Sequence, residues 1–167
     1  ALYKHAMETK LKEREHWFAT TLRSIADGVI ATDNAERITF MNAPAETMTG
    51  RSAQDSIGRP LRDVFHAKNA TTGLAVECPL SKSLREGVDV ELVNHTILIG
   101  RDREWPIDHR ASLIMDENKN VFGAVLVFRD MTENKRLEAR LALSHRLASL
   151  GTMAAGLAHE INHPLAF

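Results

Sequence analysis

Three long apolar segments near the middle of the chain constrain its fold more than any other feature. They run from Val90 to Ile99, from Glu104 to Met115 and from Val121 to Arg129. Each is rich in residues that favour strands, and the segments between them, 100–103 and 116–120, carry turn residues. The pattern predicts an antiparallel meander. Its last strand is apolar on both faces, so we expect it to lie in the centre of the sheet.

Two shorter strands are expected nearer the N-terminus. They are Val29–Thr32 and Ile38–Met41, and the residues between them, Asp33–Arg37, have the composition of a hairpin turn. Short helical segments separate this pair from the meander. Two strands, then helices, then three strands is an α+β order.

The helical segments are marked by their start and stop residues. Asn42 or Ala43 can cap a helix that Gly50 ends. A second helix should begin at Pro79 and end at Gly87, because proline is tolerated in a first turn and glycine favours a helix end. Between the two helices we expect one helical turn at residues 60–65 and a loop over residues 66–77.

The first 25 residues contain neither glycine nor proline and predict a helix. An eleven-residue repeat, interrupted only by Arg14, forms an apolar stripe: Tyr3, Met7, Leu11, Phe18, Leu22 and Ile25. Two interpretations stay open. The helix can fold against its own domain, or it can pair with the same helix of a second subunit and receive an upstream signal.

Another helix should begin directly after the last strand. Asp130 and Glu133 are spaced for a capping box at its start. Further along, a heptad stripe predicts a coiled coil or helix bundle: Leu143, Leu147, Leu150, Ala154, Leu157 and Ile161. Leu137 and Leu141 lie in a different phase, which is a stutter in the repeat. We therefore expect a homodimer.

The central region resembles a PAS domain, and four segments in this order carry the resemblance: Asp27–Asp33, Ile38–Gly50, Ile57–Leu61 and Gly123–Thr132. The resemblance implies a PAS fold, with a five-stranded antiparallel sheet and flanking helices around a small pocket. It also divides the chain into an N-terminal signalling helix at 1–25, a PAS sensor domain at 26–132 and a linker and output helix at 133–167. Asp130 and Thr132 are then expected to couple the sheet to the output helix.

Near the C-terminus, residues 159–165 fit two different chemistries. As H-E-x-x-H, they would place His159 and His163 one helical turn apart, where both can bind zinc beside Glu160 as a base. A zinc helix has to continue past its second histidine, whereas Pro164 interrupts it. The same residues, together with 146–158, resemble the phosphoacceptor (HisKA) box of sensor histidine kinases. We favour this second interpretation and expect no metal site.

That resemblance implies a role for each residue of the box. A ring nitrogen of His159 accepts the γ-phosphate of ATP, and Glu160 accepts the other ring proton. His163 occupies a position that usually carries Asn or Thr in the family, where the side chain is associated with dephosphorylating the partner. Pro164 lets the helix bend.

The expected function is therefore the sensory and dimerisation portion of a two-component sensor histidine kinase. Its implied partners are the kinase's own ATP-binding domain, which uses ATP and Mg²⁺, and the receiver domain of a response regulator. These residues alone would accept a phosphoryl group and would not transfer one. The alternative is a non-catalytic PAS signalling and dimerisation module.

A small-molecule ligand of the PAS pocket remains open at this stage. Cys78 does not lie in the sequence context of a flavin-binding photosensor, and residues 79–86 lack the histidine that haem requires, so we expect neither cofactor. His109 shares a predicted strand face with apolar residues, and Asn94 lies in the preceding strand. Both are candidate ligand contacts, although a lone histidine on such a face is usually a core residue.

Composition excludes several classes of partner and location. A formal net charge of −1 provides no basic excess for nucleic acid. One cysteine forms no internal disulfide, and no apolar run approaches the roughly twenty residues that cross a bilayer. We expect a cytoplasmic segment, with any membrane anchor elsewhere in a longer parent chain.

Overall fold

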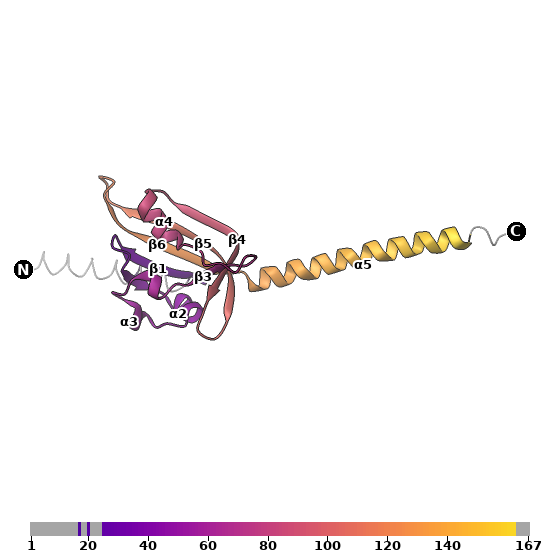
Figure 1. The fold of residues 1–167 in the computed structure, drawn as a ribbon, viewed down its shortest axis with the longest axis horizontal. Helices are drawn as coiled ribbons and strands as arrows, with labels where there is room; N and C mark the ends of the chain where they lie inside the picture. The colour runs from indigo at the N-terminus through magenta and orange to yellow at the C-terminus, as the bar shows by residue number, and fades with distance from the viewer. Residues whose placement is uncertain (1–16, 18–19, 21–24, 163–167) are drawn as a thin grey trace, which may run out of the picture. The chain divides into compact units, whose positions relative to one another are not determined.

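The computed structural model describes residues 17, 20 and 25–162, except for the side chains of 92–94 and 158–162. The chain divides into two compact units between Met131 and Thr132. The described part of the first unit contains the sheet and the short helices, and that of the second is one helix (Figure 1).

The first unit is built on a single antiparallel sheet (Figure 1). Its strands are β1 (Gly28–Asp33), β2 (Ile38–Met41), β3 (Ala67–Asn69), β4 (Val90–Ile99), β5 (Glu104–Met115) and β6 (Val121–Asp130). Their order across the sheet is β2-β1-β6-β5-β4-β3, so the last strand in the sequence pairs with the first. This confirms the predicted central position of β6.

All five predicted strands are present, and β3 is a sixth within the segment that was expected to be loop. Its residues, Ala-Lys-Asn, have little intrinsic preference for a strand. Ala67 pairs with Leu98 and Asn69 with Thr96, so the exposed edge of β4 provides the hydrogen bonds that the local sequence does not specify.

The helices between β2 and β4 are α2 (Ala43–Thr49), α3 (Ala53–Ser56), the 3-10 turn η1 (Leu61–Asp63) and α4 (Pro79–Glu86). The predicted start and end of α2 and α4 are confirmed, with Gly50 and Gly87 both left-handed at φ 69° and 71°. The sequence analysis missed α3, a single turn capped by Ser52. Four residues are too few to show a helical period.

Asn42 is the residue that joins the start of β1 to α2. Its side-chain oxygen accepts hydrogen bonds from the backbone N–H of Val29 at 2.8 Å and of Ala45 at 3.1 Å. Its side-chain nitrogen donates to the carbonyl of Asp27 at 2.9 Å. Asn42 is only 1% exposed, so each of these bonds replaces one that water would otherwise make.

The hydrophobic core lies between one face of the sheet and the helices. α4 packs against β4, β5 and β6, and α2 packs against β1. Along β6 the buried residues alternate, because Ala124, Leu126 and Phe128 face the core while Val125 and Val127 are half-buried. The largest buried side chains of this core include Phe128, Ile30, Ile38, Leu61, Leu80, Leu98, Ile107 and Leu126.

The predicted terminal helices are described to different extents. Trp17 and Thr20 are helical, and the rest of the predicted N-terminal helix lies outside the described residues. α5 (Thr132–Asn162) is continuous over 31 residues. It begins two residues after β6 ends, in agreement with a helix that follows the last strand without a loop.

Asn42→Ala should lower the free energy of unfolding by about 2–4 kcal/mol, because it removes the cap of α2 and leaves the buried N–H of Val29 without its acceptor. The measurement is the urea unfolding midpoint. Thr47→Ala, on the exposed side of the same helix, is the control and should change stability by less than about 1 kcal/mol. Equal effects of the two substitutions would contradict this role of Asn42.

Candidate functional site

His109 lies in the core of the sheet, on the strand face predicted for it. It belongs to β5, pairs with Phe128 of β6 and is 3% exposed. The Phe65 ring meets the imidazole edge to face, with ring centroids 6.4 Å apart. Within the described residues, neither ring nitrogen has a hydrogen-bond partner. A buried imidazole in this state is exceptional, because buried polar atoms are normally paired.

The surroundings of His109 favour its neutral form. Burial lowers the pKa of the imidazole to about 4, and the neighbouring carboxylate of Asp108 opposes this shift only in part. A neutral ring offers one donor and one acceptor. His109 can therefore hydrogen-bond a polar group that enters the core beside Phe65.

Asn94, the other predicted pocket residue, lies in β4 where the pairing with β5 is irregular. The register shifts between Leu92, which pairs with His109, and Thr96, which pairs with Ile107. The side chain of Asn94 is outside the described residues. Its contact with a ligand stays a prediction.

The end of β6 is held by ion pairs that the sequence analysis did not find. Arg129 donates to both carboxylate oxygens of Asp27, which precedes β1, at 2.9–3.2 Å. Arg103, in the turn between β4 and β5, lies 3.9 Å from the carboxylate of Asp130 and stacks on Trp105. Asp27 and Arg129 are 102 positions apart in the chain, and no local sequence pattern predicts a contact over that separation.

Asp130 and Thr132, the predicted coupling residues, flank the boundary between the two units. Met131 alone separates them, and its N–H donates to the carbonyl of Pro106 at 2.8 Å. The sheet is thus anchored up to the residue that precedes α5. The capping box of Asp130 and Glu133 and the coupling role of this segment stay predictions.

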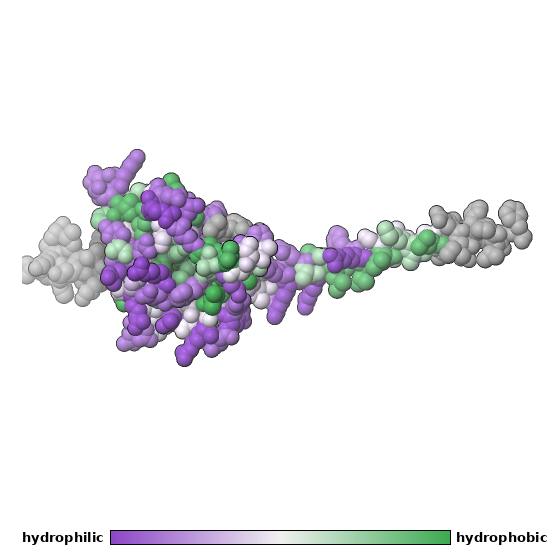
Figure 2. All heavy atoms as spheres, in the orientation of Figure 1, coloured by the Kyte–Doolittle hydropathy of each residue, from purple (hydrophilic) through white to green (hydrophobic). Residues whose placement is uncertain are grey.

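The predicted phosphoacceptor box falls at the end of the described chain. His159 and Glu160 belong to the backbone of α5, and their side chains lie outside the described residues. His163 and Pro164 lie outside them entirely. Upstream, α5 carries large apolar side chains that are more than half exposed: Leu137, Leu141, Leu143, Leu147, Leu150, Met153 and Leu157. Figure 2 shows this hydrophobic character along the outer part of the helix.

The central part of the chain, residues 18–131, matches the family model described as the PAS fold. The chain belongs to the PAS family. The crystal structure of a PAS domain from Colwellia psychrerythraea agrees with this assignment. It superposes with a TM-score of 0.53 at 21% identity, covering 74% of this chain and 98% of that domain.

Two curated relatives that this chain resembles are named for different activities. The chain is 32% identical over 144 residues to the signal transduction histidine-protein kinase AtoS of Escherichia coli, covering 86% of this chain and 22% of AtoS. It is 33% identical over 135 residues to the probable diguanylate cyclase DgcE of the same organism, covering 80% of this chain and 12% of DgcE. The chain spans about a fifth or less of the length of these relatives.

Three further properties of the described residues concern metal binding, membrane spans and the only cysteine of the chain. Among the described residues, no three His, Cys, Asp or Glu side chains come together in a way that could hold a metal ion. None of the described helices has the length and apolar character of a membrane span.

Burial raises the pKa of the Cys78 thiol to about 11, so it is protonated near neutral pH.

The low pKa of His109 predicts a pH-dependent stability of the PAS domain. Between about pH 6.5 and pH 4 the unfolded chain binds a proton at this residue and the folded chain does not, so stability falls as the pH falls through this window. From about pH 7.5 to about pH 5, wild type should lose about 2 kcal/mol more than His109→Gln.

Urea unfolding at the two pH values measures this difference. His95→Gln removes an exposed histidine from the neighbouring strand and serves as the control, which should keep the wild-type pH dependence. If wild type and His109→Gln lose the same stability on acidification, His109 is not held neutral in the folded protein.

Proposed function

We propose that this chain is the sensory and dimerisation portion of a two-component sensor histidine kinase. In this proposal the PAS domain controls autophosphorylation of His159. The phosphoryl group then passes to an aspartate in the receiver domain of a response regulator. The observation that carries the proposal is α5, a continuous helix that begins next to the central strand of the sheet and contains His159.

The similarity to AtoS, a histidine-protein kinase, supports a kinase output. A match of 144 residues cannot lie entirely within residues 1–131, so it includes part of the second unit. That unit contains the box with His159 and Glu160. The similarity to AtoS therefore extends past Met131, as does the 135-residue match to DgcE, so the kinase output is proposed from the residues of the box.

The helical register of α5 suits His159 for phosphoryl transfer. Leu157 and Ile161 belong to the apolar stripe, and each is two residues from His159, a rotation of about 200° around the helix. A nucleophile in this position is available to an ATP-binding domain while the stripe contacts another helix. A ring nitrogen of His159 forms the bond to the γ-phosphorus of ATP, the bond to the ADP oxygen breaks, and Glu160 accepts the other ring proton.

The exposed stripe of α5 supports a dimer. Leu143, Leu147, Leu150 and Leu157 are each about 60% exposed in the single chain, and leucines at heptad spacing are typical of a coiled-coil seam. A second copy of α5 would bury them. A pair of such helices also explains how a movement of two PAS sheets can reach His159, through Asp130, Thr132 and the stutter between Leu141 and Leu143.

The similarity to DgcE favours one alternative, in which the PAS domain is a non-catalytic signalling and dimerisation module. In that case α5 transmits a signal and His159 is an exposed helix residue without chemistry. Phosphorylation of His159 separates the two functions.

In the full-length protein, His159→Ala should abolish acid-labile labelling from γ-labelled ATP, because it removes the nucleophile. His163→Ala is the matched control one helical turn away and should keep the label. Labelling is measured by autoradiography after incubation with Mg²⁺ and ATP. Undiminished labelling of His159→Ala would overturn His159 as the phosphoacceptor, and a wild-type protein that takes up no label would favour the non-catalytic module.

Leu150→Asp should weaken the dimer by several kcal/mol, because it buries an unpaired charge in the seam of α5. Ser149→Asp adds the same charge at a heptad position opposite the seam and is the control. Sedimentation equilibrium measures the dissociation constant of each variant. Equal dissociation constants for the two variants would place the dimer contact outside this stripe.

A further inference from the structure

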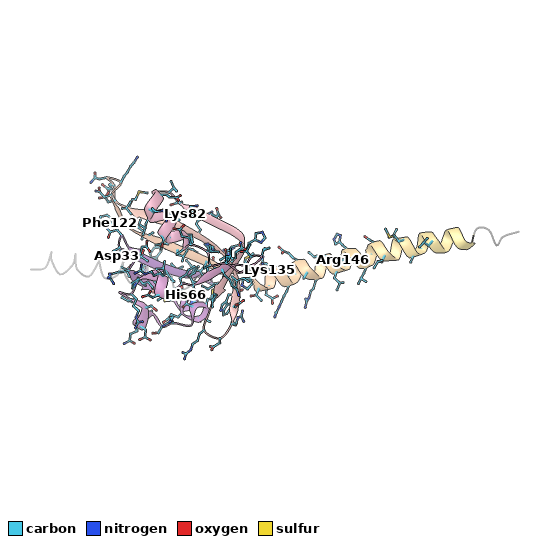
Figure 3. The ribbon with its side chains drawn as sticks, in the orientation of Figure 1. Asp33, His66, Lys82, Phe122, Lys135 and Arg146 are labelled. Atoms are coloured by element: carbon cyan, nitrogen blue, oxygen red, sulfur yellow. The ribbon has the colours of Figure 1, made fainter. Side chains whose placement is uncertain are left out.

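A surface groove of about 490 Å³ lies on the PAS domain, and its lining residues are not among those that the proposed function uses. It forms where the end of α2, the residues after η1 and the turn between β4 and β5 meet. Thr49 and Val64 are its buried residues, and Ile99 adds an exposed apolar side chain. Figure 3 labels His66, which lines the groove near α2. The volume is that of a small-molecule site.

Two glycines allow the two walls of this groove, the end of α2 and the β4–β5 turn, to approach each other closely. A β-carbon on Gly50 would overlap the β-carbon of Arg101 and lie 2.9 Å from its backbone nitrogen. A β-carbon on Gly100 would lie 2.6 Å from the carbonyl oxygen of Met48. Only glycine therefore allows the last turn of α2 to approach the β4–β5 turn so closely. The approach brings together Arg51 and Arg101, which follow these glycines in the chain.

The groove is positively charged. Arg51, His66 and Arg101 come from three separate segments, and no acidic residue lines the groove within the described part of the chain. In that same part, none of their side chains makes an ion pair or hydrogen bond. Arginines elsewhere on the sheet have carboxylate partners, as in the pairs Arg110–Glu91 and Arg129–Asp27.

We propose that this groove binds the phosphate group of a small organic phosphate. Guanidinium groups donate paired hydrogen bonds to phosphate oxygens, and two of them match the charge of a phosphate monoester, about −1.5 to −2 near pH 7. His66 adds a further donor in the same groove, and Val64 and Ile99 provide apolar surface for the organic part. A carboxylate carries about half the negative charge of a phosphate monoester, so it balances the charge of one arginine and leaves that of the other unbalanced.

The β4–β5 turn gives this site a direct connection to the end of the sheet. The turn is closed by the hydrogen bond from the Gly100 N–H to the Arg103 carbonyl at 3.0 Å. Arg101 lines the groove on one side of the turn, and Arg103 reaches the carboxylate of Asp130 from the other. A ligand that orders Arg101 therefore orders the turn that contacts the last residue of β6.

Isothermal titration calorimetry of the 167-residue chain with phenyl phosphate tests the site, and benzoate is the carboxylate counterpart. Phenyl phosphate should bind with 1:1 stoichiometry and at least about tenfold more tightly than benzoate. Arg51→Gln and Arg101→Gln should each weaken its binding by about tenfold or more. Arg59→Gln removes the same charge outside the groove and should bind as wild type does.

Three results would overturn the assignment. They are a failure of phenyl phosphate to saturate the wild-type chain, an affinity for phenyl phosphate no higher than that for benzoate, and a loss of affinity in Arg59→Gln as large as that in Arg101→Gln. Circular dichroism melting curves of the variants, unchanged from wild type, exclude unfolding as the cause of a loss. Because the assay uses neither ATP nor His159, its result is independent of the proposed kinase function.

Discussion

The pairing of β1 with β6 is the contact on which the rest of the PAS domain depends. It joins the first and last strands of the domain in one antiparallel ladder, from Gly28 opposite Phe128 to Asp33 opposite Gly123. The close approach of Gly123 to the carbonyl of Thr32 leaves no room for a side chain at that position. Since the partners are about a hundred residues apart, the loss of chain entropy on pairing is large and the core under the sheet has to compensate for it.

This ladder also places the start of β1 beside the end of β6. It brings Asp27, at the entry to β1, against Arg129, at the exit of β6. Asn42 links the start of β1 to α2, and Arg103 links the end of β6 to the β4–β5 turn. In the proposed mechanism, a displacement of the central strands would reach Met131, the residue before α5, and the signal would pass along that helix to His159.

Two candidate ligand sites, the predicted one at His109 and the groove proposed above, differ in chemistry. His109 is a neutral imidazole in an apolar core, suited to one or two hydrogen bonds with an uncharged group. The groove with Arg51 and Arg101 is cationic and open to solvent, suited to an anion. Both lie on strands or turns that lead to the end of β6, so occupancy of either can bias the same output.

The amino-acid sequence by itself determined the five predicted strands, the limits of α2 and α4 and the central position of β6. Turn residues and strand-favouring segments mark the strands locally, and Asn42, Gly50 and Gly87 mark helix ends. It also indicated His159, through a dense motif. Only the tertiary structure decided that 67–69 form a strand, that Arg129 pairs with Asp27 and that Arg51 and Arg101 line the same groove. Each of these depends on a partner far away in the chain, and no local pattern encodes which distant residue will approach.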